Sequence, residues 1–411
     1  MLSKRDNDTL TRTGPGAMMG QLMRRYWLPV ALAEEVAEPD GAPARIEVLG
    51  ERFVAFRDTA GKLGLLAEHC PHRGASLALA RNEDHGLRCI YHGWKFDVTG
   101  QCLDTPTELP EHSLAGRVKA RSYPVREVAG VLWAYLGPRD KMPPFPDLQW
   151  LQLPPSHSTP FKILEECNYA QALEGGIDFA HAAVLHRNSP WSRTNDDVRE
   201  RNPRPRVEVQ DTAWGFFYTG LWGSDSQTHV RIHPFVFPCW TVVAPNAYGS
   251  ANGQGDRVVN AWVPRDDGTT WHFQYFYNPT KPVDREWRIR TAGCYVDAAY
   301  RKLRNADNRY NQTREAMRTT NLSGIDGVLT QDHAVNESQG PVVDRVQEHL
   351  AASDRAVIHV RKVLLEAARD VAEGKDPPGL APGTTLSHVT SQTADLPEGA
   401  CWEDVPPAST S

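Results

Sequence analysis

The chain has no block of like charge and no long apolar run. Lys and Arg number 45 against 51 Asp and Glu among its 411 residues, which gives a formal net charge of -6. Phosphate binding needs concentrated positive charge, so we do not expect a nucleic-acid partner. Residues 232–255 carry no formal charge but contain several prolines and asparagines, whereas a membrane-spanning helix needs about 20 predominantly apolar residues. The sequence therefore predicts strands and a turn in this stretch, and no membrane span.

Cysteine is scarce and scattered. Seven cysteines, an odd number spread over a large chain, do not form a disulfide framework. The pair Arg24-Arg25 imitates a twin-arginine export signal. The apolar segment that follows is short, contains Pro29 and ends in Glu34-Glu35, which is atypical of an export signal. We therefore expect a protein of the reducing cytoplasm.

The length and the turn residues predict two domains. Residues 1–145 contain short apolar runs separated by turn residues, which is typical of an all-β domain. Residues 146–160 are rich in proline and indicate a linker. Residues 161–373 combine strand patterns with helical ones, and residues 374–411 are rich in Pro, Ser and Thr and predict an extended arm. The fold class expected for the second domain is α+β, a sheet with helices packed on it.

Two helices of the second domain stand out. Residues 165–185 read as a helix interrupted at Gly175-Gly176. Residues 354–373 place apolar side chains on one side at helical spacing and predict an amphipathic helix.

Two short ligand pairs occur in the first domain. Cys70 and His72 form a C-x-H pair, and Cys89 and His92 form a C-x-x-H pair, with residues 73–88 between them. Two thiolates and two imidazoles could bind one zinc ion, or a [2Fe-2S] cluster with both cysteines on one iron and both histidines on the other. Glycine follows each pair and allows the backbone to close around inorganic sulfide.

A second group of polar residues lies on one side of the helix expected at 165–185. Asn168, Gln171, Asp178, His181 and His186 fall on the same side when each residue advances by about 100°. The two histidines are about 140° apart, so joint metal binding requires a bulge or break between them. Two histidines and one carboxylate form the ligand set of non-haem Fe(II) oxygenases. The alternative is that these histidines belong to the core or the surface.

Taken together, the two motifs resemble those of the Rieske non-haem iron ring-hydroxylating oxygenases, in particular the phthalate dioxygenase-like branch. The resemblance runs from Tyr26-Trp27-Leu28-Pro29 to Asp332. It implies an N-terminal Rieske domain followed by a helix-grip catalytic domain with an antiparallel sheet. It also implies one [2Fe-2S] cluster and one mononuclear Fe(II). The implied cluster ligands are Cys70, His72, Cys89 and His92, and the implied iron ligands are His181, His186 and Asp332.

The resemblance assigns further roles. Asp332 matches the distant carboxylate of the iron site, although sequence alone does not rank it above the neighbouring acids Asp326, Glu337 and Asp344. His333, next to it, reads as an outward-facing helix residue. Asp178 matches a catalytic carboxylate that bridges an iron histidine to a cluster histidine of the neighbouring subunit, so a homo-oligomer is expected, a trimer or stacked trimers. Asn168 matches a position near the iron.

The substrate is indicated by a single basic residue. Arg231 lies in a strand where the phthalate branch has an arginine that binds the substrate carboxylate, and Arg can hold a carboxylate by two parallel bonds. A second arginine of the family is replaced near Leu221, which favours a mono-carboxylate of the substituted benzoate class over phthalate. Surface placement of Arg231 is the alternative. Aromatic side chains on the strands could line a flat apolar pocket: Phe216, Phe217, Trp240, Trp262, Phe273 and Tyr275.

The resemblance implies the oxygenase component of a two-component enzyme that dihydroxylates an aromatic carboxylate with O2. No G-x-G-x-x-G motif opens a βαβ unit. We therefore expect the electrons to come from a separate reductase of the flavin and iron-sulfur type. One alternative is a Rieske monooxygenase that removes a methyl group from oxygen or nitrogen, and another is a non-catalytic Rieske or zinc-binding protein.

Overall fold

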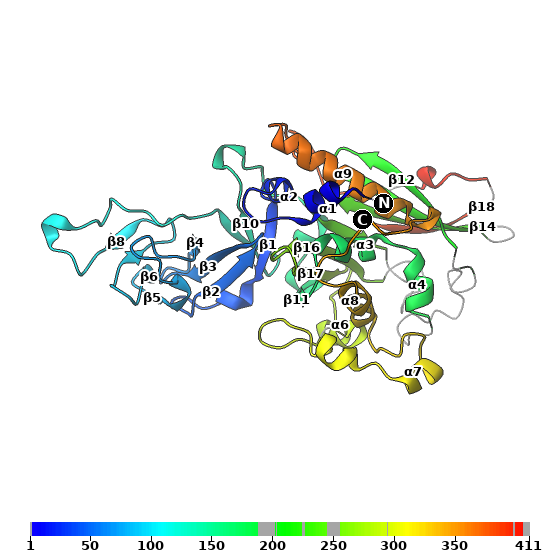
Figure 1. Cartoon of the computed structure of the whole chain (residues 1–411), viewed down its shortest axis with the longest axis horizontal. Helices are drawn as coiled ribbons and strands as arrows, with labels where there is room; N and C mark the ends of the chain where they lie inside the picture. The colour runs from blue at the N-terminus through cyan, green and yellow to red at the C-terminus, as the bar shows by residue number, and fades with distance from the viewer. Residues whose placement is uncertain are drawn as a thin grey trace. The chain divides into compact units, whose positions relative to one another are not determined.

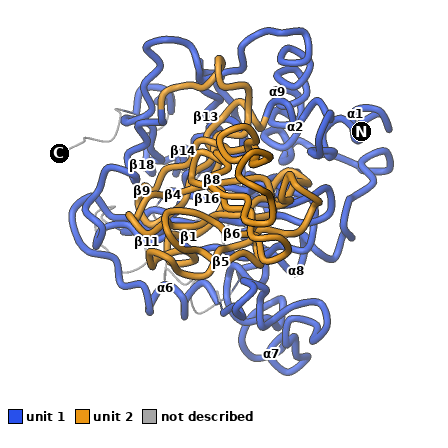
Figure 2. The backbone as a smooth tube through the Cα atoms, turned by 90° about the vertical axis from the view of Figure 1, so that its left-hand side faces the viewer, with its two compact units in different colours: residues 1–22, 145–411 blue, residues 23–144 orange. Residues whose placement is uncertain are grey.

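A computed structural model describes residues 2–187, 202, 204–223, 227–244, 255–293, 295–397 and 399–405. The chain forms two compact units, shown in Figure 2. The small unit comprises residues 23–144, and the large unit comprises residues 1–22 and 145–411.

The first 22 residues depart from the expected division, which assigned residues 1–145 to one domain. They belong to the large unit because helix α1 (Lys4–Thr11) buries Leu10 and Thr11. The hydroxyl of Tyr169 donates to the carbonyl oxygen of Leu10 at 2.9 Å. A terminal segment with such partners packs with the body that supplies them.

Three antiparallel sheets make up the small unit, whose described strands fit the predicted all-β domain. The three-stranded sheets are β1 (Trp27–Leu32), β10 (Val131–Tyr135) and β9 (Val125–Val128), and β2 (Ala44–Val48), β3 (Glu51–Arg57) and β4 (Leu63–Ala67). The four-stranded sheet consists of β5 (Arg81–Glu83), β6 (Gly86–Arg88), β7 (Lys95–Phe96) and β8 (Cys102–Asp104). One core cluster buries both Cys70 and Cys89 among apolar side chains, so the two expected cluster loops are anchored in the core.

An eight-stranded antiparallel sheet forms the centre of the large unit (Figure 1). Its order is β11-β17-β16-β15-β14-β13-β12, and β18 pairs with β14. The strands are β11 (Ser158–Glu165), β12 (Arg206–Thr212), β13 (Gly215–Gly223), β14 (Gln227–Val236), β15 (Trp240–Val243), β16 (Arg257–Pro264), β17 (Thr270–Tyr277) and β18 (Gln392–Pro397). Residues 245–254 of the uncharged stretch lie outside the described residues.

Helices pack on this sheet, which confirms the α+β class. Helix α3 packs on β16 and α9 on β12 (Figure 1). The helices are α2 (Met18–Met23), α3 (Tyr169–Ile177), α4 (Ala180–Leu185), α6 (Arg285–Ala292), α7 (Arg314–Thr319), α8 (Val328–Ser338) and α9 (Arg355–Ala372). The amphipathic helix expected at 354–373 is α9. No helix in the described part of the chain is long and apolar enough to span a membrane.

The interruption expected at Gly175-Gly176 is in a different place. Helix α3 continues through both glycines, and the chain leaves helical geometry at Asp178. The glycines instead allow close packing, because a Cβ at Gly176 would lie 2.1 Å from the Trp262 ring and one at Gly175 would lie 2.5 Å from Asn336. These two glycines are therefore needed because a side chain would not fit, and not because the backbone turns there.

The expected linker and arm both pack against the large unit. In residues 146–160, Trp150 is fully buried and contacts the rings of Trp240 and Tyr277. In residues 374–411, β18 extends the sheet through its pairing with β14. Trp402 is buried in a core cluster beyond β18, while residues 398 and 406–411 of the arm lie outside the described part of the chain.

Candidate metal centres and active site

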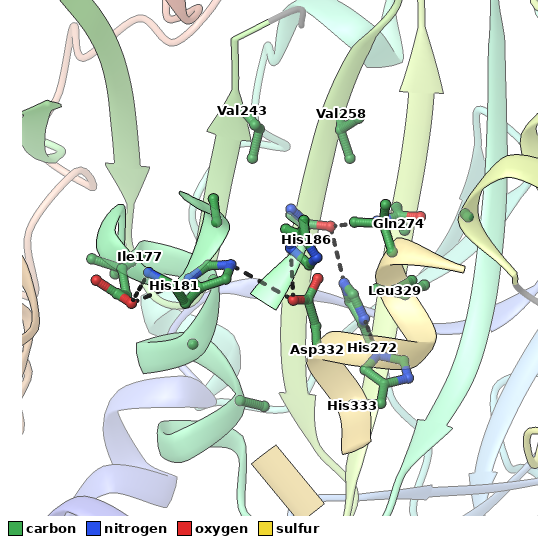
Figure 3. Close-up of a pocket in the computed structure, with 18 of the residues that line it drawn as sticks. Ile177, His181, His186, Val243, Val258, His272, Gln274, Leu329, Asp332 and His333 are labelled. Atoms are coloured by element: carbon green, nitrogen blue, oxygen red, sulfur yellow. Dashed lines mark hydrogen bonds and ion pairs between the residues drawn. The ribbon is translucent and has the colours of Figure 1, made fainter. Parts of the chain in front are cut away.

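Three metal-ligating side chains gather at one place in the large unit. The ligand atoms of His181, His186 and Asp332 all lie within 4.8 Å of one another. Asp332 Oδ1 is 3.6 Å from His181 Nε2 and 3.1 Å from His186 Nε2. Figure 3 shows both imidazoles facing this carboxylate, which α8 supplies. Residues distant in the sequence therefore form a compact donor set.

The three acids that the sequence left as alternatives to Asp332 for the iron carboxylate have other partners. Asp326 contacts Arg304, Glu337 contacts Lys302, and Asp344 accepts a hydrogen bond from the backbone of Val346. Of these four acids, the structure brings Asp332 to the two histidines.

Asp178 sets the direction of His181. It follows α3 in an extended conformation, and its carboxylate accepts hydrogen bonds from the backbone N–H groups of Ala180 and His181 at 2.8 and 2.9 Å. The same carboxylate lies 3.2 Å from His181 Nδ1. Because Nδ1 is engaged in this way, Nε2 of the ring is the nitrogen that faces Asp332.

His186 is oriented by a residue that the sequence reasoning missed. Helix α4 ends at Leu185, so His186 lies beyond the helix and its direction is not fixed by the 100° advance of helical residues. Its Nδ1 is 2.7 Å from Gln331 Oε1, and the amide nitrogen of Gln331 donates to the carbonyl oxygen of Ile325 at 2.8 Å. The amide oxygen thus accepts from His186 Nδ1, so Nε2 is the ring nitrogen that faces Asp332. The only sequence signal for Gln331 is its position next to Asp332.

The charges of this site suit a cation. Burial raises the pKa of the Asp332 carboxyl, but the two histidines outweigh this effect and lower the pKa below its ordinary value. Burial likewise raises the pKa of Asp178, but the hydrogen bond and charge of His181 and the backbone N–H groups of Ala180 and His181 together outweigh it, so this pKa is also lowered. For His181, burial lowers the pKa, while the contacts with Asp178 and Asp332 outweigh it and raise the pKa. Both carboxyl groups are therefore ionised near neutral pH.

This donor set fits Fe(II). Two imidazole nitrogens and one carboxylate on one side of an ion leave positions open for other ligands. The hydrogen bonds to Asp178 and Gln331 supply the outer contacts that hold metal-binding imidazoles in one tautomer.

A cavity of about 270 Å³ lies against these residues, which form part of its lining. Its apolar walls include Ile177, Val243, Val258 and Leu329, labelled in Figure 3. The aromatic residues expected to line the pocket mostly belong to the core instead. Of the six, Trp262 is among the lining residues.

Arg231 and Asn168 have different outcomes. Arg231 is 4% exposed and lines the cavity, which excludes the alternative of surface placement. Asn168 caps α3: its Oδ1 accepts from the backbone of Ala170, and its Nδ2 donates to the carbonyl oxygens of Thr11 and Asp267. Asn168 is not among the cavity-lining residues. This geometry corrects the expectation that it lies near the iron, because its side chain is used for capping and for holding neighbouring backbone.

A second, fully buried donor group adjoins the cavity, whose lining includes two of its members, His272 and His333. The ligand atoms of Glu165, His272 and His333 lie within 4.8 Å of one another. His333 is 1% exposed, so it is not the outward-facing residue that was expected. Burial and the charge of Glu337 raise the pKa of Glu165 to about 8, and burial lowers the pKa of His272 to about 3. Sequence reasoning missed this group because its members come from three separate elements, β11, β17 and α8.

The two ligand pairs of the small unit lie on matching turns. The backbone N–H of Gly74 donates to the carbonyl oxygen of Cys70 at 2.8 Å, and that of Gly93 donates to Cys89 at 2.9 Å. Both glycines have positive φ, 76° and 74°, a conformation that side chains disfavour. The imidazoles that follow each cysteine lie close together, with 4.5 Å between the ring centroids of His72 and His92.

These four side chains fit a two-iron cluster better than a single zinc ion. Four ligands of one zinc ion lie within about 4 Å of one another. Among the described residues, the sets of three donors within 4.8 Å are the two groups in the large unit, and neither includes a ligand of the small unit. Burial raises the pKa of the Cys70 thiol to about 11, an effect that a bound metal would reverse. The neighbouring histidines stay out of this arrangement: His69 bonds to the carbonyl oxygen of Gly74, and His85 is exposed.

Two family models match the chain, one in its N-terminal third and one over most of the remainder. Residues 26–124 match the family described as Rieske [2Fe-2S] domain, and residues 134–406 match the one described as LigXa C-terminal domain like. A crystal structure of dicamba monooxygenase bound to dicamba is similar with a TM-score of 0.64 and 18% identity, over 86% of this chain and 99% of that chain.

Curated relatives are similar over nearly the whole chain. The phthalate 4,5-dioxygenase oxygenase subunit of Pseudomonas putida is 38% identical, over 98% of this chain and 94% of that protein. The 3-chlorobenzoate-3,4-dioxygenase oxygenase subunit of Comamonas testosteroni is 33% identical, over 98% and 97%. The 5,5'-dehydrodivanillate O-demethylase oxygenase subunit of Sphingobium sp. is 31% identical, over 92% and 83%.

The chain belongs to the Rieske non-haem iron oxygenases. It is an oxygenase subunit of the branch that includes the phthalate and chlorobenzoate dioxygenases, as the sequence motifs predicted. The family carries a [2Fe-2S] cluster and a mononuclear non-haem iron, and its oxygenase subunits work with a separate electron-transfer component and O2. Family membership decides against the non-catalytic and zinc-binding alternatives.

Proposed function

We propose that this chain dihydroxylates an aromatic carboxylate of the substituted benzoate class, with electrons from a separate reductase of the flavin and iron-sulfur type. The observation that carries the proposal is a single cavity whose lining includes both the iron-type donor set and a buried arginine, Arg231. The proposed iron ligands are His181, His186 and Asp332. The proposed cluster ligands are Cys70, His72, Cys89 and His92.

The metal groups supply the redox chemistry: when bound, the cluster and Fe(II) deliver electrons singly and activate O2. The chain's own residues bind the substrate and orient it. Arg231 Nη2 donates to the carbonyl oxygen of Ala244 at 2.7 Å, which fixes the direction of the guanidinium. A guanidinium has five N–H donors, so it can bind a substrate carboxylate as well. The apolar walls then receive the ring and exclude water from it.

Asp178 supports a proposal about assembly. Its side chain is 21% exposed while it holds His181. A partly exposed carboxylate can accept a further hydrogen bond, and we propose that a cluster histidine of the neighbouring subunit provides it in a trimer or stacked trimers. Sedimentation of the metal-loaded protein should give three or six copies. A monomer at micromolar concentration would contradict the proposal.

Demethylation is the second candidate, because one relative is named an O-demethylase oxygenase subunit. Labelled oxygen separates the two reactions. Dihydroxylation incorporates both atoms of one 18O2 molecule into one ring, whereas removal of a methyl group does not.

The test is a product screen with anaerobically reconstituted enzyme, which should contain about three irons and two acid-labile sulfides per chain. A surrogate reductase supplies electrons, and substituted benzoates are the substrates. We expect a cis-dihydrodiol from at least one benzoate, and loss of that product in Arg231→Met. If no benzoate is converted while the same preparation converts an aromatic substrate without a carboxylate, the proposed substrate class is wrong.

A further inference from the structure

Neighbouring strands give the cavity a polar wall. Asn260 on β16 and Gln274 on β17 are direct cross-strand partners, and His272 lies two residues before Gln274 on the same face. All three line the cavity, and their exposed fractions are 7%, 6% and 2%. Buried polar side chains require hydrogen-bond partners, because leaving them unpaired is costly.

The hydrogen bonds within this wall leave one polar atom, an amide oxygen, without a partner. Asn260 Oδ1 accepts from His272 Nε2 at 3.0 Å and from Gln274 Nε2 at 2.8 Å. Since the nitrogen of the Gln274 amide is used for Asn260, its oxygen points elsewhere. Gln274 Oε1 is buried and has no hydrogen-bond partner among the described residues.

The direction of these bonds is set by His272. Burial keeps the pKa of this imidazole near 3, so it is neutral and has a single ring N–H. Nε2 lies 3.0 Å from the acceptor Asn260 Oδ1, so the ring proton is on Nε2, and Nδ1 is the acceptor in its 3.1 Å contact with His333 Nε2. Asn260 presents its oxygen to both side chains, and Gln274 presents its nitrogen to Asn260.

An apolar side chain at position 274 would complete the cavity wall without leaving a buried carbonyl unpaired. Gln274 instead presents a carbonyl oxygen that is unpaired within the described part of the chain and can accept a hydrogen bond from a ligand in the cavity. The cavity that it lines is the one proposed above for the aromatic carboxylate.

We propose that Gln274, held in place by Asn260 and His272, is a specificity-determining residue that accepts a hydrogen bond from a hydroxyl or amino substituent on the substrate ring. This inference rests on the proposed function and narrows it, from substituted benzoates in general to benzoates with a second, hydrogen-bond-donating group. Chloro and methyl substituents of similar size cannot donate, and they leave Gln274 Oε1 unpaired.

The test compares matched ligands on the metal-loaded enzyme under anaerobic conditions, so that no turnover occurs. Titration calorimetry gives Kd for 3-hydroxy-, 3-amino-, 3-chloro- and 3-methylbenzoate and for the corresponding 4-substituted series. We expect the hydroxy or amino compound of one series to bind at least about tenfold more tightly than its chloro and methyl counterparts. This comparison needs no variant and stands even if a substitution impairs folding.

Variants then assign the preference to one atom. Gln274→Met, which keeps the length of the side chain but removes the acceptor, should abolish the preference for donors. Gln274→Glu, which keeps an acceptor oxygen, should retain it. Val258→Ala is the matched control: it alters an apolar lining residue and should change the Kd of donor and non-donor ligands by the same factor. Iron content and the cluster absorption spectrum verify that each variant is intact.

The outcomes separate this inference from the function on which it rests. If all benzoates bind in an Arg231-dependent manner with no preference for donors, the Gln274 subsite is wrong and the substituted benzoate class stands. A preference that survives in Gln274→Met also overturns the subsite. If no benzoate binds, both the proposed function and this inference are wrong.

Discussion

The two regions proposed to bind metals are built in different ways. In the small unit, two cysteine-histidine pairs lie on two turns between residues 70 and 92, and a glycine with positive φ follows each pair. In the large unit, the two histidines lie near residue 181 whereas the carboxylate comes from α8, beyond residue 328. A turn-based site depends on local backbone geometry, while a site assembled from distant helices depends on packing and on the side chains that orient its ligands.

Because the two regions use separate residues and separate structural supports, removing a ligand from one region should leave the metal of the other in place. Cys70→Ser should lose the cluster, with two irons and two sulfides per chain, and keep about one iron. His181→Ala should keep the cluster spectrum and lose the mononuclear iron. Turnover should fall below detection in both variants, because each removes one redox centre. Iron and sulfide analysis with EPR of the dithionite-reduced protein measures both effects.

His85→Ala is the matched control, since this exposed histidine lies between the two ligand pairs. It should keep both metals. Loss of the mononuclear iron in Cys70→Ser would show that the two regions depend on each other, and the contrast drawn above would fail.

The same contrast explains what the sequence could predict. The two cysteine-histidine pairs and the all-β unit could be predicted from the sequence, because ligand spacing and turn residues are local properties of the chain. The proposed iron histidines could be predicted as a pattern, but the interruption of the helix was placed at Gly175-Gly176. Its position at Asp178 depends on how the carboxylate bonds to the backbone of Ala180 and His181. Gln331, His272 and Glu165 were missed because only tertiary packing brings them to the site. Asn168 was placed near the iron from the family resemblance, whereas its role as a helix cap depends on bonds to Ala170, Thr11 and Asp267 that the sequence does not show.

Asp178→Asn tests the one residue proposed to connect the two regions between subunits. Both metals should remain, because the amide oxygen can take the place of Oδ2, which contacts the backbone N–H and Nδ1 of His181, while only the hydrogen bond from Ala180 is lost. Turnover should fall about a hundredfold or more, since a neutral amide is a weaker acceptor for a second imidazole than a carboxylate. Stopped-flow oxidation of the reduced cluster, in the presence of substrate and O2, measures the loss directly.

Glu366→Gln, at an exposed acid on α9, is the control for a lost negative charge and should oxidise its cluster at the normal rate. Normal cluster oxidation in Asp178→Asn would remove Asp178 from the path of the electrons.

Gln331→Met probes the dependence of the large-unit site on outer contacts. The substitution keeps the size of a fully buried side chain but removes the oxygen that accepts from His186 Nδ1. We expect the affinity for Fe(II) to fall about 10- to 100-fold, because the imidazole loses its fixed tautomer and direction. Competition with a coloured chelator measures the affinity, and the cluster spectrum should not change.

Thr330→Val, on the same helix, tests whether disturbed packing of α8 alone weakens the site, since its hydroxyl bonds to Gly293 rather than to a ligand. Equal losses of iron affinity in Thr330→Val and Gln331→Met would mean that helix packing, not the hydrogen bond to His186, accounts for the effect.

The effects on turnover are expected to be smallest at the two glycines of the cluster turns. Both have φ near 75°, so alanine at either position should cost about 1–2 kcal/mol of stability through backbone strain. A Cβ at Gly74 meets nothing within 4 Å, whereas one at Gly93 would lie 2.6 Å from Cγ of Pro106. Because a proline ring cannot swing aside, Gly93→Ala should cost about 1–3 kcal/mol more than Gly74→Ala. Urea titration, followed by the cluster absorbance, ranks the stability of the two variants. Equal midpoints would mean that the turn carrying Cys89 and His92 shifts enough to relieve the clash with Pro106.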